Sequence, residues 1–176
     1  MGKKGVEIID LDVQKLIALL NEALAEEWLA YYQYWIGARV MSGPMRTDVE
    51  KELYAHAAEE LHHAELLAAR IIELDGTPVL SPDEWTSLAR CKYESPTDPY
   101  VETILLQNLA SERCAIQRYE ALAQLTDGKD FTTFSIVTEI LAEEAEHEHD
   151  IESWLEDIRL FRESLVSTMV EKEILE

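Results

Sequence analysis

Two Glu-x-x-His pairs are the residues of this sequence whose types and spacing fit metal binding. The segment LAEEAEHEHD, residues 141–150, carries Glu144 and His147, and the segment EELHHAE carries Glu60 and His63. Residues three apart lie on one face of a helix, so each pair can present a carboxylate and an imidazole to one point. A single pair is a weak indication, because both residue types are common on solvated faces.

The apolar pattern around each pair indicates that both pairs face inward. Glu144 and His147 interrupt an apolar stripe at helical spacing, whose other members are Val137, Ile140, Ile151, Trp154 and Ile158. Glu60 and His63 interrupt a second stripe, whose apolar members are Val49, Leu53, Leu67, Ile71 and Leu74. His62, Glu146 and His149 fall outside these stripes. One pair from each segment is therefore expected in the interior.

Two other stripes each contain a single acidic residue. Glu27 follows Leu16, Leu20 and Ala23, and Glu112 follows Val101 and Leu105. Glu26 lies off its stripe. Four buried carboxylates would repel each other strongly, and two divalent cations would cancel the formal charge of four glutamates with two neutral histidines. These ligands suit iron or manganese. The alternative is a bundle with buried polar layers and no metal.

Four helices must position these side chains. Gly and Pro cluster at SGPM (42–45), at 75–99 and at TDGKD (126–130), and helix-forming residues fill the stretches between them. We expect helices at about 11–41, 47–75, 99–126 and 131–158. Short first and third connections make neighbours antiparallel, and the long connection 76–98 makes the middle helices parallel. The predicted fold is all-α, a four-helix bundle with one long crossover, in which Ser81, Pro82 and Glu84 begin a short extra helix.

The length and composition fit one domain over 1–176. We expect a core bundle at about 10–158 and a helical tail at 159–176, whose direction the sequence leaves open. The 176 residues are 47% hydrophobic, and no stretch is apolar enough for a membrane span. MGKKGVEIID lacks the apolar region of a secretory signal, so a cytoplasmic location and reduced Cys91 and Cys114 are the default. The net charge of −21 disfavours nucleic acid and attracts cations.

Residues 10–158 resemble the ferritin-like superfamily, specifically bacterioferritin and its Dps-like relatives. The similarity lies in LNEALAEEWLAYYQYW, EELHHAELLAARIIELDGTP, LASERCAIQRYEAL and ILAEEAEHEH. The resemblance implies a di-iron centre within one subunit and, as in the thioferritins, a twelve-subunit shell. The family's metal ligands fall on Glu27, Glu60, His63, Glu112, Glu144 and His147. Tyr34 matches a tyrosine near the metals, with packing and redox roles equally open.

The cysteines and two departures from the family qualify this resemblance. The thioferritin resemblance implies a disulfide between Cys91 and Cys114, against the alternative of two free thiols. Leu61 stands where bacterioferritins carry a haem-binding methionine, so no haem is expected. The N-terminal segment has only Lys3 and Lys4, so no DNA binding is expected.

The expected function is a ferroxidase of an iron-storing mini-ferritin. It oxidises Fe(II) with hydrogen peroxide or oxygen, which gives iron detoxification and protection against oxidative stress. Glu60 or Glu144 bridges the two irons. The alternative is a peroxidase, catalase or oxygenase with two irons or two manganese ions and no storage. His56, one turn before Glu60, is expected to be a satisfied or edge residue rather than a partner of the metal ligands. Glu139, Glu143 and Glu146 are expected on a solvated face, with mineral nucleation as the alternative.

Overall fold

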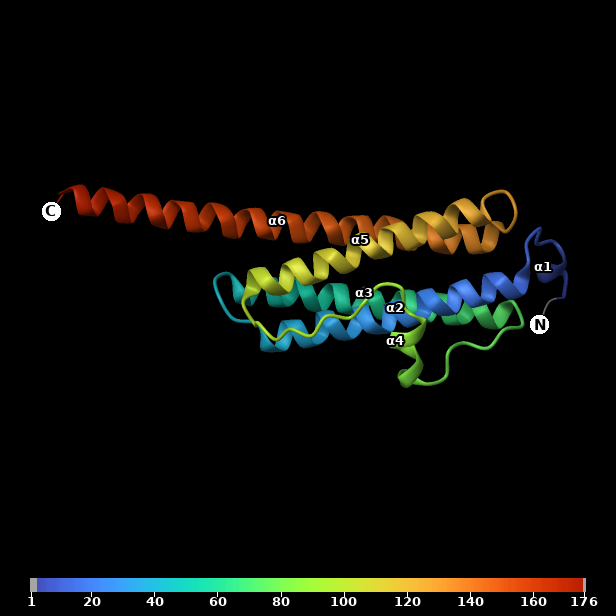
Figure 1. The fold of residues 1–176 in the computed structure, drawn as a ribbon. Coiled ribbons are helices and arrows are strands. Elements are labelled where there is room, and N and C mark those ends of the chain that lie inside the picture. The colour runs from blue at the N-terminus through green and yellow to red at the C-terminus, as the bar shows by residue number, and fades with distance from the viewer. Residues whose placement is uncertain (1–2, 176) are drawn as a thin grey trace.

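Four long helices form the body of the molecule (Figure 1). The computed structural model describes the backbone of residues 3–175 and the side chains of residues 4–166. The long helices are α2 (Val13–Val40), α3 (Arg46–Glu73), α5 (Val101–Thr126) and α6 (Phe131–Leu175). The first three agree with the expected helices within about three residues. The fourth continues without a break through the tail, whose direction the sequence left open.

The topology is the expected one. Helices α2 and α3 are antiparallel neighbours, as are α5 and α6, while α3 and α5 run in the same direction (Figure 1). The crossover that joins α3 to α5 contains a 3-10 turn, η1 (Pro82–Glu84), and one turn of helix, α4 (Trp85–Leu88). Ser81 caps η1 by accepting a hydrogen bond from the Asp83 N–H rather than from Glu84. A short α1 (Lys3–Glu7) precedes the bundle and was not expected.

The turn after α2 is tied to the end of the crossover. The Ser42 N–H donates to the Pro99 carbonyl at 2.8 Å, and the Val101 N–H donates to the Ser42 carbonyl at 2.8 Å. Gly43 adopts φ +121°, a backbone conformation that L side chains rarely adopt. The two bonds fix the start of α5 beside the end of α2. None of the helices that the structure describes has the length and apolar character needed to cross a membrane.

The core consists of two apolar clusters, one toward each end of the bundle. Leu16 to Leu24 of α2 belong to one cluster, and Tyr34 to Met41 of the same helix belong to the other. The other three long helices divide between the clusters in the same way. On each helix the break between the clusters falls at the predicted metal ligands. A polar layer therefore crosses the bundle between two apolar regions.

Candidate dinuclear metal centre

The polar layer brings together all six side chains that the sequence analysis singled out as metal ligands. One helix pair contributes Glu27 from α2 with Glu60 and His63 from α3, and the other pair contributes an equivalent set from α5 and α6. That second set consists of Glu112, Glu144 and His147. Each of the six residues is at most 2% exposed. The burial follows from helical spacing, because each residue occupies a core-facing position of its own helix.

The six side chains form two overlapping groups of possible ligand atoms. One group contains Glu27, Glu60, His63 and Glu144, and the other contains Glu60, Glu112, Glu144 and His147. The ligand atoms within each group lie within 4.8 Å of one another. Glu60 and Glu144 belong to both groups. The geometry thus offers two adjacent positions for cations, with two carboxylates able to reach both.

The atoms that face these two positions lack hydrogen-bond partners. They include the Nδ1 atoms of His63 and His147, and five carboxylate oxygens of the four glutamates, namely Glu27 Oε2, Glu60 Oε1, Glu112 Oε2, Glu144 Oε1 and Glu144 Oε2. Buried polar atoms are normally paired, because an unpaired one costs roughly 1–3 kcal/mol. Seven such atoms converging on one place would be costly without a cation. The donor set, carboxylate oxygen with imidazole nitrogen, fits two divalent iron or manganese ions.

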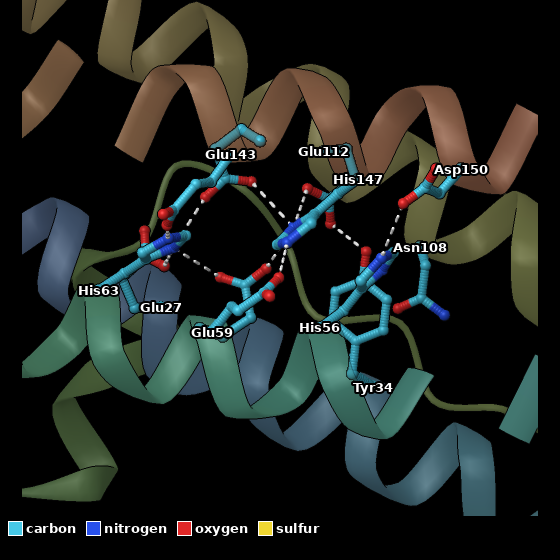
Figure 2. A network of polar contacts seen from close by, with 12 residues as sticks. Glu27, Tyr34, His56, Glu59, His63, Asn108, Glu112, Glu143, His147 and Asp150 are labelled. Atoms are coloured by element: carbon cyan, nitrogen blue, oxygen red, sulfur yellow. Dashed lines mark hydrogen bonds and ion pairs between the residues drawn. The ribbon is translucent and has the colours of Figure 1, made fainter. Parts of the chain in front are cut away.

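Each histidine ring is oriented by a glutamate from the opposite helix pair. The Nε2 atom of His63 lies 2.7 Å from Oε2 of Glu143 on α6, and Nε2 of His147 lies 2.6 Å from Oε2 of Glu59 on α3. Figure 2 shows these two crossed contacts and the rings turned toward the ligand carboxylates. A carboxylate on Nε2 holds the proton there and leaves Nδ1 free to bind a metal.

The role of Glu143 corrects the expectation of a purely solvated residue, while Glu139 and Glu146 are exposed as expected. The sequence analysis also missed Glu59. A signal for both residues exists in the sequence, because each Glu-x-x-His pair is preceded directly by a second glutamate, in EELHH and in EEAEH.

Two tyrosines make a similar pair of crossed contacts. The Tyr34 hydroxyl of α2 donates to Glu112 of α5 at 2.6 Å, and the Tyr119 hydroxyl of α5 donates to Glu27 of α2. Both tyrosines are buried, and each lies seven residues after the glutamate of its own helix. The position of Tyr34 near the ligands agrees with the family match. Tyr119 was not singled out from the sequence, although the same seven-residue spacing marks it.

Without metal ions this layer retains protons. Burial, and then the Glu60 carboxylate, raise the pKa of Glu27 to about 8. Burial and the carboxylates of Glu60 and Glu112 raise the pKa of Glu144 well above its usual range. Burial disfavours the charged form of His147, but the carboxylates of Glu112 and Glu60 beside its Nδ1 atom outweigh it and raise its pKa to about 11. Metal ions that bind here must displace protons.

The crossover covers one side of the centre and is fastened there. Cys91 of the crossover and Cys114 of α5 form a disulfide, the pairing that the thioferritin resemblance implies. Glu26 accepts hydrogen bonds from the N–H groups of Arg90 and Cys91 and from the guanidinium of Arg118. Glu26 is buried, so its position off the apolar stripe did not mean exposure.

A small pocket connects this covering segment to the candidate centre. Its lining includes Cys91 and Tyr93 of the crossover and four of the six ligand residues, which are Glu27, Glu60, Glu112 and Glu144. Cys91, one half of the disulfide, therefore shares this pocket with the ligands.

Comparison with known proteins places these features in one family. The model of the ferritin-like domain matches residues 17–161, so the chain belongs to the ferritin-like family. The DNA protection during starvation protein of Pyrococcus furiosus is 37% identical over 159 residues, which are 89% of this chain and 83% of that protein. The bacterioferritin of Streptomyces coelicolor is 29% identical, with 90% of each chain covered.

A solved structure is more similar to this chain than these two proteins are. It is the bacterioferritin-related protein of Bacteroides fragilis, described as a dodecameric thioferritin. Its TM-score is 0.91 at 56% sequence identity, and the match covers 93% of this chain and 98% of that one. Dps from Thermosynechococcus elongatus shares the fold, with a TM-score of 0.77 at 20% identity over 81% of this chain and 90% of that one.

Proposed function

We propose that this chain is the subunit of an iron-storing shell and a ferroxidase that oxidises Fe(II) at its buried centre, with hydrogen peroxide as the preferred oxidant and oxygen as the other. The observation that carries the proposal is the convergence on two adjacent cation positions of seven possible ligand atoms, none of which has a hydrogen-bond partner. Family membership supports iron as the metal. Consumption of Fe(II) together with peroxide removes both reagents of hydroxyl-radical chemistry, which makes the protein protective.

Each part of the centre has a distinct task in this proposal. Glu27 and His63 hold one Fe(II), Glu112 and His147 hold the other, and Glu60 and Glu144 reach both. Two bound Fe(II) ions supply one electron each, which matches the two-electron reduction of one peroxide to water. Glu59 and Glu143 keep the Nε2 protons of the histidines in place. The Tyr34 hydroxyl holds one carboxylate oxygen of Glu112, and the Tyr119 hydroxyl holds one carboxylate oxygen of Glu27.

Storage requires a shell, and similarity to known proteins supports one. The Bacteroides fragilis protein is described as a dodecamer, and its similarity spans nearly the whole of this chain. The net charge of −21 favours the approach of Fe(II). We propose a twelve-subunit shell in the cytoplasm, with iron as the native metal, no haem and no bound DNA.

Iron loading of the purified protein tests the proposal. Excess Fe(II) is added anaerobically, peroxide follows, and the iron that co-elutes with protein on a sizing column is counted per chain. A large particle with many more than two irons per chain is expected. Glu60→Gln should abolish rapid oxidation and loading, whereas the exposed Glu146→Gln should load like the wild type.

The same experiment separates the alternatives. About two irons per chain, with peroxide still consumed, would indicate a di-iron peroxidase without storage. Protein that retains no iron would refute the metal centre.

A further inference from the structure

A second cluster of possible metal ligands lies beside the dinuclear centre, between α3 and α6. It consists of Glu52 and His56 on α3 and Asp150 on α6, and one ligand atom from each lies within 4.8 Å of the others. None of the three belongs to the six ligands of the centre. Figure 2 shows His56 of α3 and Asp150 of α6 facing each other.

The distances within this cluster are those of ligands around an ion. Nε2 of His56 lies 3.6 Å from Oε1 of Glu52 and 3.7 Å from Oδ2 of Asp150, which is beyond hydrogen-bond range. Ligand atoms about 2.1 Å from a tetrahedral cation stand roughly 3.4 Å apart. Small side-chain adjustments would therefore place all three atoms around one divalent ion.

The state of His56 is an independent observation that points to a ligand. The residue is 2% exposed, and among the described residues its ring makes no hydrogen bond, because Nε2 lies 3.6 and 3.7 Å from the nearest oxygens of Glu52 and Asp150. This corrects the expectation of a satisfied or edge histidine. The ring stacks on His147 with ring centroids 4.1 Å apart and meets Tyr34 edge-on, so packing holds Nε2 toward the two carboxylates.

The negative charges of Glu52 and Asp150 are also not fully compensated. Among the described residues, Glu52 and Asp150 form ion pairs with His56 alone and with no lysine or arginine. Two carboxylates close together repel each other, and the ring nitrogen that faces them, Nε2 of His56, lies more than 3.5 Å from each. A divalent cation would neutralise both carboxylates and bind Nε2 of His56 at once.

We propose that Glu52, His56 and Asp150 form a third divalent-cation site, which takes Fe(II) and its substitutes Co(II) and Zn(II). The side chains of Glu52 and Asp150 are 36% and 35% exposed, so an ion can enter this site from solvent. Three protein ligands leave a position for water, which suits an exchangeable ion. Because His56 stacks on His147, we assign this site as one that binds Fe(II) before the ion reaches the dinuclear centre. That role rests on the proposed function, whereas the binding of a cation does not.

Cobalt diffraction and titration test the site without relying on activity. Crystals of the assembled, metal-free protein are soaked in Co(II), and anomalous peaks are located at the cobalt absorption edge. We expect three peaks per subunit, two in the dinuclear centre and one between His56, Glu52 and Asp150. An anaerobic Co(II) titration should give three ions per chain. A wild-type protein with no cobalt beside His56 would overturn the proposal, and this test needs no variant.

Variants then assign the ligands. Glu52→Gln combined with Asp150→Asn alters two half-exposed residues and should remove one cobalt while leaving two. His62→Ala replaces an exposed histidine of the same helix and should retain three. A third peak that persists in the double variant would also refute the site. If Glu112→Gln loses cobalt from the dinuclear centre but keeps the peak beside His56, the two sites bind independently. A failure of iron storage with the third peak present would count against the proposed function alone.

Discussion

At the residue scale, the centre is built from one arrangement used twice. Glu27, Tyr34 and the Glu59–Glu60–His63 run of the first helix pair match Glu112, Tyr119 and the Glu143–Glu144–His147 run of the second. Every supporting contact crosses between the pairs, from Tyr34 to Glu112 and from Glu59 to His147. Each ligand is therefore held by a residue of the opposite helix pair, so that docking of the two pairs completes the centre.

The crossed carboxylates should control metal affinity. Glu59→Ala and Glu143→Ala are expected to weaken Co(II) binding at the dinuclear centre by roughly 10–100-fold each, because the histidine ring loses the group that orients it and holds the Nε2 proton. Equilibrium titration of metal-free protein measures this. Glu146→Ala, an exposed residue of the same helix, is the control. Unchanged affinity in both variants would show that packing alone orients the rings.

The protons held by the empty centre predict an effect of pH on stability. The ordinary pKa values are 4.5 for Glu27 and 6.5 for His147, and the folded values are raised to about 8 and about 11. Between pH 6.5 and 8 the unfolded chain has largely lost protons that the folded chain keeps. Stability therefore falls as pH rises, by at most about 1.4 kcal/mol per pH unit for each such proton.

Metal binding reverses this dependence. Because bound cations replace the protons, the difference in Tm between Co(II)-loaded and metal-free protein should widen from pH 6.5 to pH 8. Thermal unfolding of both forms at the two pH values measures it, and a pH indicator should detect proton release on Co(II) addition. A Tm difference that narrows with rising pH would contradict the protonated empty centre.

At the scale of elements, the crossover acts as a fastened cover rather than a free connection. The disulfide joins residues 23 apart in sequence, and Glu26 binds the backbone beside Cys91. Cys91→Ser combined with Cys114→Ser should lower the free energy of unfolding by roughly 3 kcal/mol, because the unfolded chain gains the entropy of an open loop. Denaturant titration measures the change.

Reduction provides the control for this variant. Wild-type protein in strong reductant should approach the stability of the double variant, whose own stability should not respond to the reductant. A double variant as stable as the oxidised protein would mean that Glu26 and its partners suffice to hold the crossover.

At the scale of the whole molecule, helix α6 extends well beyond the other three long helices (Figure 1). Among the side chains that the structure describes, which end at residue 166, Ile158 is the last buried one of this helix, and residues 159–166 are exposed. Four of these are apolar, namely Leu160, Phe161, Leu165 and Val166. An exposed apolar group on a projecting helix is typical of an interface, and in the proposed shell it would pack against neighbouring subunits.

Charge substitutions in this extension should therefore impair assembly. Phe161→Glu combined with Leu165→Glu is expected to shift the protein from a large shell to small species, because burying two carboxylates in an apolar interface is unfavourable. Light scattering after a sizing column measures the mass. Glu163→Gln, in the same segment, should leave the shell intact. Full-size particles from the double variant would place the interface elsewhere.

The charge of the whole chain predicts no affinity for DNA. With a net charge of −21, each subunit repels phosphates, and the shell would add these charges together. No retention of duplex DNA is expected in a gel at low salt, the condition that most favours electrostatic binding. Retention that weakens with added salt would contradict this.

The sequence by itself determined the four-helix plan and the six ligand candidates. This was possible because helical periodicity is local: a glutamate or histidine within an apolar stripe must face the core, whatever packs against it. The loop lengths set the topology. The helical character of 159–176 was predicted, but its straight continuation from α6 was not, since helical periodicity does not tell whether a helix goes on or turns at the end of the bundle.

Only the tertiary structure decided which residues of different helices meet. Glu59 and Glu143 lie off the apolar stripes of their own helices, so their contacts with the two histidines depend on the docking of α3 against α6. The burial of Glu26 depends on the crossover, and the position of His56 beside Asp150 depends on the register of two helices. Periodicity gives the direction in which a side chain points, whereas the angle and register of packing decide what it touches.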